Sequence, residues 1–304
     1  MNRRLLKRAL AALMLVPLLL SGCGESVPEE GLEAKVGVLL VSHGSHSKNW
    51  RDMLVDVEHS VRDRIMADGQ VAEVRTAFME YNEPSISTQM RAFDEAGFDE
   101  VIVVPLFLTV SSHSLDDIPT ILGMKADPKV IAKLAEEEIE LYRPRARVTL
   151  TPMLDFSSLL KKNLLRRTQA LAEDTTDTGV VLVAYGDARY NQQWETLVGD
   201  IGRYLKLKAG IDTVAYAWCG HLVDYSPEPT LRAIEQVLEL EDRAVVLPVL
   251  VAVDPAFQDD IIGEAVAQSP EGSRVRYAGD AILPDAGLND WVVEIVRQTL
   301  DGGA

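Results

Sequence analysis

The chain has 304 residues, of which 47% are hydrophobic, and its formal net charge at pH 7 is −17. This length and hydrophobic content are enough to bury a large core, and the length suggests about two domains. The excess of acidic residues argues against nucleic acid and anionic lipid surfaces as partners, because both repel a negative protein. It favours the approach of cations, and it opposes a polycarboxylate substrate unless a local basic patch overrides the overall field.

The first 22 residues have the pattern of an export signal. A basic start precedes an apolar run from Ala9 to Leu20, which is too short for a comfortable membrane span. The letters LSGC at residues 20–23 are similar to a bacterial lipobox, which implies cleavage before Cys23 and lipidation of its thiol. The alternative is an ordinary signal peptide with a chance cysteine. We favour the lipoprotein, because a polar tether at residues 23–35 follows, and we expect the chain to be exported and lipid-anchored on the periplasmic side of a bacterial cell envelope.

The chain contains two cysteines, Cys23 and Cys219. If Cys23 carries lipid, Cys219 has no partner for a disulfide, despite the oxidising compartment. We therefore interpret Cys219 as a small buried hydrophobe.

The rest of the chain consists of two copies of one sequence repeat. In both copies a continuous apolar run leads to an aromatic ring residue and a glycine, and a helical segment with a tryptophan follows. The matched stretches are 36–45 with 179–188, 50–57 with 194–201, 74–85 with 214–229, 103–119 with 246–262, and 147–165 with 274–292. We therefore expect an N-terminal lobe at residues 36–171, a linker at 172–178 and a C-terminal lobe at 179–304.

Each copy predicts four strands that alternate with helices. Short runs of Val, Ile and Leu without polar alternation are typical of strands buried on both faces. Their alternation with helical segments indicates a parallel sheet with right-handed crossovers. The predicted fold class is α/β, with two lobes related by internal duplication, each a parallel sheet flanked by helices. The first copy has extra charged residues of helical pattern within 124–146.

Polar side chains follow the first three predicted strands of the first copy: His43, Glu80 and His113. Ligands of open parallel sheets bind beyond the carboxyl ends of the strands, so we expect these three side chains to converge at one edge. Two imidazoles and a carboxylate suit Co²⁺, Ni²⁺, Fe²⁺ or Zn²⁺ with open coordination positions, and they can also move protons. A lone histidine after a strand is more often a capping residue. Here two of the five histidines occupy equivalent strand ends, which favours a functional site.

The stretches LLVSHGS (39–45), AFMEYNEPSI (77–86) and VVPLFLTVSSHSLDDIP (103–119) resemble the CbiX/SirB group of sirohydrochlorin chelatases, the class II chelatases. These enzymes insert Co²⁺ or Fe²⁺ into sirohydrochlorin on the routes to cobalamin and sirohaem. The resemblance covers residues 36–123 strongly and the rest as a degenerate second copy.

The resemblance implies two flavodoxin-like (chelatase-like) lobes with a puckered tetrapyrrole in the cleft between them. It implies that His43 and His113 hold the incoming divalent metal, with Glu80 as a ligand or proton acceptor. The metal is then a substrate, and no organic cofactor is expected. Glu83 is a rival for Glu80, but its place before Pro84 fits a helix cap better.

The chain also departs from the family pattern. His46 is either an extra metal ligand or a solvated polar contact, and we favour the contact. In the second copy Tyr185, Gly220 and Ala256 replace His43, Glu80 and His113, so that lobe cannot repeat the metal site. His221 follows Gly220, and we hypothesise that it faces the cleft from the second lobe.

The second copy has no histidine at the position of His113, but it keeps two other features of the same stretch. The acidic pairs Asp116–Asp117 and Asp259–Asp260 each precede an apolar helical segment, where carboxylates cap free N–H groups. We therefore interpret both pairs as structural caps, and the recurring prolines Pro105 and Pro248 as part of the fold.

Two functional hypotheses remain open. The first is a metal chelatase, an enzyme, and the second is an exported non-catalytic carrier that binds a metal or tetrapyrrole in the same cleft. Export and the acidic surface favour the carrier, because tetrapyrrole synthesis is normally cytoplasmic. Retention of all three site residues favours the enzyme, which we prefer. A structural envelope protein would not need those residues.

Overall fold

A computed structural model describes residues 34–154, 158–172 and 174–302. The predicted signal peptide, the lipidation site Cys23 and residues 23–33 of the tether lie outside these ranges. None of the helices in the described part of the chain is long and apolar enough to cross a membrane.

The first four strands form one parallel sheet. They are β1 (Val36–Ser42), β2 (Val71–Phe78), β3 (Glu100–Pro105) and β4 (Arg147–Leu150), in the spatial order β2-β1-β3-β4. Every residue of β1 is buried, as the continuous apolar run predicts. Because all four strands are parallel, their carboxyl ends lie at the same edge of the sheet.

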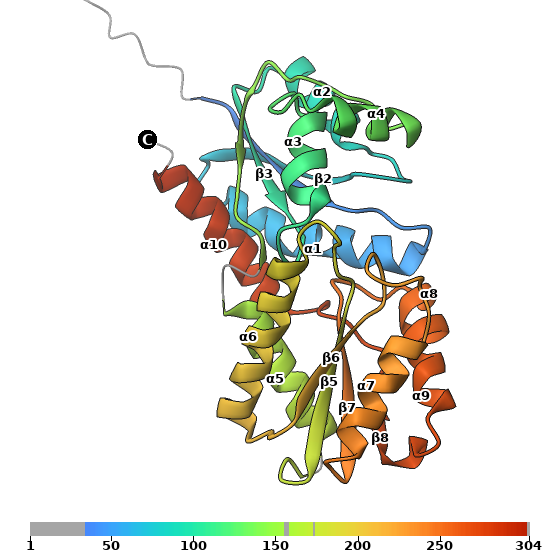
Figure 1. The fold of residues 1–304 in the computed structure, drawn as a ribbon. Helices are drawn as coiled ribbons and strands as arrows, with labels where there is room; N and C mark the ends of the chain where they lie inside the picture. The colour runs from blue at the N-terminus through green and yellow to red at the C-terminus, as the bar shows by residue number, and fades with distance from the viewer. Residues whose placement is uncertain (1–33, 155–157, 173, 303–304) are drawn as a thin grey trace, which may run out of the picture. The chain divides into compact units, whose positions relative to one another are not determined.

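The second copy builds the same sheet again. Its strands are β5 (Thr178–Ala184), β6 (Val214–Trp218), β7 (Arg243–Val249) and β8 (Val275–Tyr277), in the order β6-β5-β7-β8. Pro105 pairs with Val41 in the first sheet, and Pro248 pairs with Val183 in the second. The two parallel sheets confirm the predicted α/β class and the two lobes (Figure 1).

Helices connect the strands of each sheet. The helical segments of the first copy are α1 (Lys48–Met66), α2 (Ile86–Glu95), a π-helical turn (His113–Asp117), α3 (Ile118–Ile121), α4 (Pro128–Glu136) and α5 (Leu159–Leu171). Those of the second copy are α6 (Asn191–Ala209), α7 (Glu228–Leu238), α8 (Pro255–Phe257), a π-helical turn (Gln258–Gly263), α9 (Glu264–Gln268), a 3₁₀ turn (Gly272–Arg274) and α10 (Ala286–Gly302). Helix α4 lies within the extra residues of the first copy.

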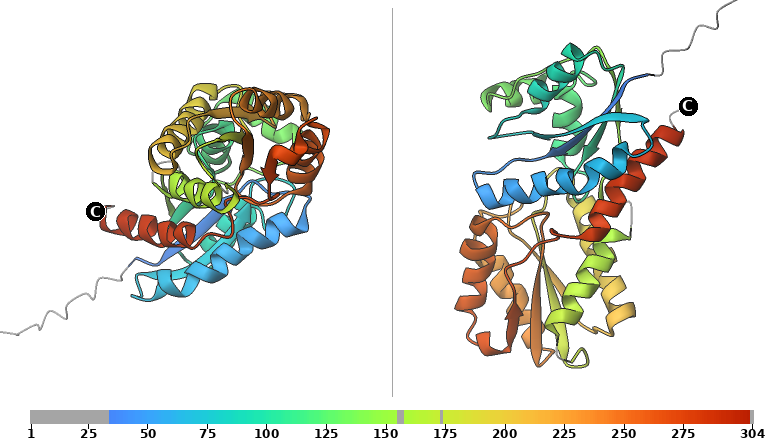
Figure 2. Two further views of the ribbon diagram at one scale, coloured as in Figure 1. Left: turned by 90° about the horizontal axis from the view of Figure 1, so that it is seen from below. Right: turned by 180° about the vertical axis from the view of Figure 1, so that it is seen from behind.

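The last helix of each copy packs on the sheet of the other copy. Helix α5 lies against α6 and β7, and α10 lies against α1 and β3 (Figures 1 and 2). The buried guanidinium of Arg167 on α5 donates to the carbonyl of Pro248 at 2.8 Å and to Asp280 at 3.0 Å. Sequence repeats and packing units therefore differ, because α5 is in the first repeat but is buried on the second sheet.

This exchange gives the two sheets a shared core. Val38 and Leu40 of β1 belong to the same buried cluster as Val180 and Leu182 of β5. The alternate residues of each strand point the other way and pack under the helices of their own lobe, α2 and α4 in the first and α7 in the second. The shared core thus holds the two sheets together.

Candidate metal site and cleft

The three side chains predicted to converge do meet at the carboxyl edge of the first sheet. One ligand atom from each of His43, Glu80 and His113 lies within 4.8 Å of the other two. Nε2 of His43 is 3.9 Å from one carboxylate oxygen of Glu80, and Nδ1 of His113 is 3.9 Å from the other. The two imidazole rings are 4.7 Å apart between centroids. Separations of this size leave room for one cation among the three groups.

The backbone around His43 fixes this arrangement. The amide of Glu80 donates to the carbonyl of His43 at 2.8 Å, so the segments that leave β1 and β2 are tied together. Gly44 has a φ of +102°, and a Cβ added there would lie 2.0 Å from the carbonyl oxygen of Glu80. Glycine is therefore required next to His43, because other residues rarely adopt this positive φ and because their Cβ would clash with the Glu80 carbonyl.

Hydrogen bonds determine which ring nitrogen of each histidine is free. Nδ1 of His43 lies 3.0 Å from the carbonyl oxygen of Gly44, and Nδ1 of His113 lies 2.8 Å from a carboxylate oxygen of Asp117. Since both oxygens are acceptors, each Nδ1 carries the proton and each Nε2 keeps its lone pair. Nε2 of His113 is buried and has no hydrogen-bond partner in the described part of the chain. A metal would therefore bind through Nε2 of each imidazole, while Nδ1 of His113, the nitrogen that lies 3.9 Å from Glu80, is held by Asp117.

Electrostatics keep His43 in the form that binds a metal. Loss of solvent is the main cause that holds the pKa of His43 below its ordinary value of 6.5, and the neighbouring His113 acts in the same direction. The negative charge of Glu80 opposes this effect but does not cancel it. At neutral pH the imidazole of His43 is uncharged, so a metal can bind it without displacing a proton.

Asp117 is a partner of His113, not a helix cap. Its side chain is 2% exposed, makes no capping hydrogen bond, and accepts from Nδ1 of His113 and, at 3.0 Å, from Nζ of Lys133. Burial by itself raises the pKa of Asp117, but the hydrogen bonds from His113 and Lys133 outweigh it, so the net pKa is lowered. Lys133 belongs to α4, in the extra residues of the first copy. The capping interpretation of this aspartate is therefore wrong.

Asp116 does not cap the helix either; it bridges the two lobes. Its carboxylate accepts from Nη1 of Arg189 at 2.8 Å and from the hydroxyl of Tyr190 at 3.0 Å. Ser112, four residues earlier, makes a second bridge through its amide and hydroxyl to Asp187, both at 2.9 Å. The counterparts Asp259 and Asp260 in the second copy are exposed. The acidic pair that both copies share therefore makes different contacts in the two lobes.

The second lobe provides the opposite wall of a cleft. Tyr185 stands where the first lobe has His43, and a Cβ added to Gly220 would lie 2.5 Å from the Tyr185 ring. The tyrosine ring thus occupies the space that a larger side chain at 220 would need. Ala256 is exposed at the third position. No second group of three potential ligands occurs within residues 34–154, 158–172 and 174–302.

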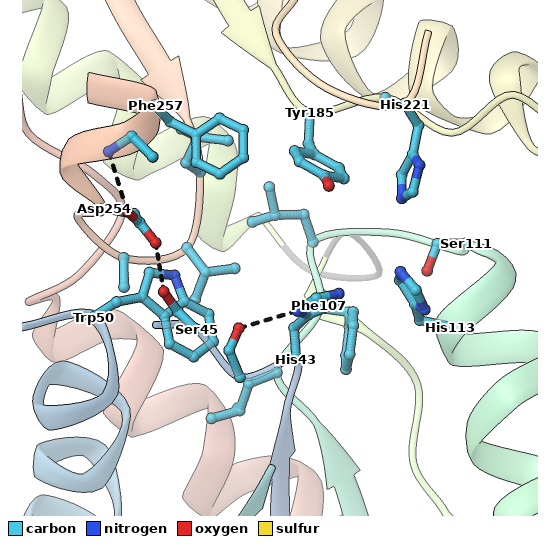
Figure 3. A pocket seen from close by; sticks show the side chains of 18 of the residues that line it. His43, Ser45, Trp50, Phe107, Ser111, His113, Tyr185, His221, Asp254 and Phe257 are labelled. Carbon is cyan, nitrogen blue, oxygen red and sulfur yellow. Dashed lines mark hydrogen bonds between the residues drawn. The ribbon is translucent and has the colours of Figure 1, made fainter. Parts of the chain in front are cut away.

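The cleft between the lobes has a volume of about 380 Å³. Its lining is mainly aromatic and aliphatic and includes Trp50, Leu106, Phe107, Tyr185, Trp194 and Phe257 (Figure 3). Among the described residues that line it, the charged ones are Asp187 and Asp254, and none is lysine or arginine. Ser45 donates to Asp254 across the cleft at 2.5 Å. The overall negative charge is therefore not reversed by a local basic patch in the cleft.

The remaining sequence candidates have distinct positions. His221 lies in the cleft, with its ring 5.8 Å from that of His113 and 4.8 Å from that of Tyr185 (Figure 3). His46 is exposed, packs against Tyr81 with 4.7 Å between ring centroids, and lies outside the group of three ligands. Glu83 is exposed and accepts from the amide of Ser85, which caps α2.

Cys219 is fully buried and free, as predicted. Burial raises the pKa of its thiol to about 12, so the thiolate that would react or bind metal does not form at neutral pH. The partners Asp117 and Lys133 were not found from the sequence. The placement of Asp117 four residues after His113 was a signal for this contact, because that spacing brings two side chains together on one helical turn.

We expect Asp117→Asn to weaken Co²⁺ binding about 10–100-fold, the usual cost of losing the partner of a metal-binding histidine. The amide no longer compensates Lys133 and orients the His113 ring less firmly. Isothermal titration with CoCl₂ measures the change. Asp260→Asn, at the exposed counterpart in the second copy, is the matched control and should bind as the wild type does. Equal affinities for Asp117→Asn and wild type would contradict this role.

The fold has close counterparts among solved structures. The sirohydrochlorin chelatase SirB from Bacillus subtilis subspecies spizizenii, in complex with cobalt, has a TM-score of 0.63 at 18% identity, covering 88% of this chain and 96% of that one. CbiX, the terminal enzyme for sirohaem biosynthesis in denitrifying bacteria, has a TM-score of 0.56 at 16% identity, covering 86% and 98%. At these identities the likeness shows the two-lobed fold.

Sequence comparisons identify the family. The CbiX family model matches residues 37–171. The sirohydrochlorin cobaltochelatase of Saccharolobus solfataricus is 28% identical over 132 residues, covering 43% of this chain and 92% of that protein. That of Sulfurisphaera tokodaii is 34% identical over 115 residues, covering 34% of this chain and 91% of that protein. Each relative is thus comparable in length to one repeat. The resemblance carried by residues 39–45, 77–86 and 103–119 is confirmed, and the chain belongs to the CbiX family.

Proposed function

We propose that this chain is a chelatase that inserts a divalent metal, Co²⁺ or Fe²⁺, into sirohydrochlorin or a related tetrapyrrole. The observation that carries the proposal is the meeting of His43, Glu80 and His113 within 4.8 Å, with both imidazoles lining an aromatic cleft. The names of the relatives and the cobalt complex of the SirB structure support the same chemistry.

The donor set suits the metal as a substrate that must arrive and leave again. Two imidazole nitrogens and a carboxylate hold Co²⁺ or Fe²⁺, and they fit Ni²⁺ equally well by donor type. With three protein ligands, coordination positions stay open, so a macrocycle nitrogen can bind before the protein ligands dissociate. A fully enclosed four-ligand site would hold the metal too firmly for transfer.

Metal insertion also releases two protons, because both pyrrole N–H groups of the free ring lose their hydrogen when M²⁺ enters. Each proton needs an acceptor close to the ring. On the first lobe the acceptor is Glu80, whose carboxylate lies between the two imidazoles. On the second lobe it is His221, which faces His113 across the cleft. Loss of solvent lowers the pKa of His221, so this imidazole is uncharged at neutral pH and can accept a proton.

We expect wild-type protein lacking residues 1–23 to convert sirohydrochlorin and Co²⁺ into the metal complex, followed by the change in absorbance. His113→Ala should insert at least about 100-fold more slowly, because it removes a ligand from the site that delivers the metal. Turnover by the wild type alone supports the chelatase.

The same assay tests the alternative of an exported carrier. Stoichiometric binding of Co²⁺ or tetrapyrrole by the wild type, without turnover, would establish the carrier and refute the enzyme. The absence of lysine and arginine from the described lining favours capture of a cation and gives this alternative its support.

His221→Ala is expected to leave Co²⁺ affinity within about twofold of wild type and to slow insertion by about 100-fold, the typical contribution of a proton acceptor. Its ring lies outside the group of three ligands but inside the cleft. His59→Ala, at an exposed histidine on α1 that does not line the cleft, is the control. An insertion rate equal to that of wild type would remove His221 from the mechanism.

We also propose that Cys23 carries lipid and holds the two lobes at the periplasmic side of the cell envelope. The LSGC letters, the basic start and the polar tether support this. Expressed in its own host, the wild type should sediment with membranes, and Cys23→Ser should remain in the soluble fraction. A wild-type protein found in the soluble fraction would contradict the anchor.

A further inference from the structure

Two tyrosines at the cleft have an unusual backbone conformation. Within the described ranges, three residues other than glycine have positive φ: Tyr81 at 64°, Glu138 at 58° and Tyr225 at 47°. Both tyrosines line the cleft. Bulky residues rarely adopt this region, because the Cβ atom comes too close to the backbone, at a cost of about 1–2 kcal/mol per residue.

Burial does not offset this cost. Tyr81 is 60% exposed and Tyr225 is 52% exposed, so each ring keeps much of its surface in water. Glycine would adopt the same backbone conformation without strain. Strain retained at half-exposed aromatic residues points to function, since backbone geometry does not favour tyrosine there and burial is incomplete.

The two residues lie in corresponding loops of the two lobes, although the residue that aligns with Tyr81 is His221. Tyr81 lies in the loop between β2 and α2, directly after the metal-site residue Glu80. Tyr225 lies in the loop between β6 and α7, the equivalent connection of the second sheet. The two walls of the cleft therefore each carry one exposed tyrosine in the loop that follows the second strand of the repeat.

Neighbouring rings hold both tyrosines in position. The ring centroid of Tyr81 lies 4.7 Å from that of His46, with the two rings tilted by 40°, and 5.9 Å from that of His43. The hydroxyl of Tyr225 is 2.9 Å from that of Tyr185, and its ring is 6.2 Å from Phe257. Each ring is thus supported on one side and still exposes surface to the cleft.

Among the described residues that line the cleft, charged side chains are few. Since none of the described lining residues is lysine or arginine, ring contacts must supply much of the affinity for an aromatic ligand in this cleft.

We propose that Tyr81 and Tyr225 form an aromatic clamp, with one tyrosine ring from each lobe, that binds the conjugated ring of a tetrapyrrole in the cleft. The inference rests on the proposed function and names the part of the substrate that is recognised, namely the ring face. Offset stacking on a tyrosine requires a conjugated surface, which the macrocycle supplies whatever its edge substituents are. The clamp positions the ring, while His43, Glu80 and His113 hold the metal.

The test measures ring binding and thermal stability in the same variants. Metal-free sirohydrochlorin is titrated into the purified protein, and the fluorescence of Trp50 and Trp194, which line the cleft, reports binding. Tyr81→Gly and Tyr225→Gly should each weaken Kd about fivefold to tenfold, the effect of losing one aromatic pair. The melting temperature of Tyr81→Gly should equal or exceed that of wild type, because glycine relieves the strained φ.

Further variants separate the clamp from other effects. Tyr81→Phe should bind the ring more tightly than Tyr81→Gly, because the phenyl ring still stacks. Tyr216→Ala, at a tyrosine that is 46% exposed but does not line the cleft, is the control and should bind as wild type does. Unchanged Co²⁺ affinity in the glycine variants would show that the metal site is intact.

Three results would overturn the clamp, and they differ in what they imply. Glycine variants that bind sirohydrochlorin as wild type does would refute the clamp, and insertion of Co²⁺ by the wild type would then leave the chelatase standing. A lower melting temperature with unchanged Kd would assign the tyrosines a structural role. A wild-type protein that neither binds sirohydrochlorin nor inserts metal would refute both proposals.

Discussion

The burial of α5 and α10 across the two sheets is the constraint on which the rest of the structure depends. Each helix is encoded at the end of one repeat and covers the sheet of the other, so neither repeat can bury its apolar face alone. The shared core that results places the carboxyl edges of both sheets on opposite walls of one cleft. The bridges from Ser45 to Asp254 and from Asp116 to Arg189 add polar contacts between two lobes that hydrophobic burial holds together.

The extra residues of the first lobe help to position one histidine, His113. Helix α4 brings Lys133 to Asp117, and Asp117 orients His113. The second lobe lacks both the histidine and a counterpart of α4. A buried carboxylate that is compensated on one side by an ammonium group can bind an imidazole proton on the other without a large desolvation cost. The extra segment that carries α4 and the metal site of the first lobe are therefore structurally linked.

The sequence predicted the strands and the convergence of His43, Glu80 and His113, but not which sheet each terminal helix covers. The apolar runs, the repeat and the strand ends after which His43, Glu80 and His113 stand were all readable, because buried parallel strands leave a continuous apolar signature. The exchange of α5 and α10 was not, since an amphipathic helix shows which face it buries but not which sheet receives it. Asp116 and Asp117 were misinterpreted for a related reason. Two acids before a helix fit a cap, and only the fold shows Lys133 and Arg189 nearby.

The duplication has a consequence for how such a site can change over time. A cleft built between two identical single-lobe chains would have to be symmetric, so every substitution would appear on both walls at once. Here one chain carries both walls, and Tyr185 with Gly220 faces His43 with Glu80. Each wall can therefore vary without altering the other. Covalent linkage of the two copies separates the evolution of the metal-holding wall from that of the wall opposite.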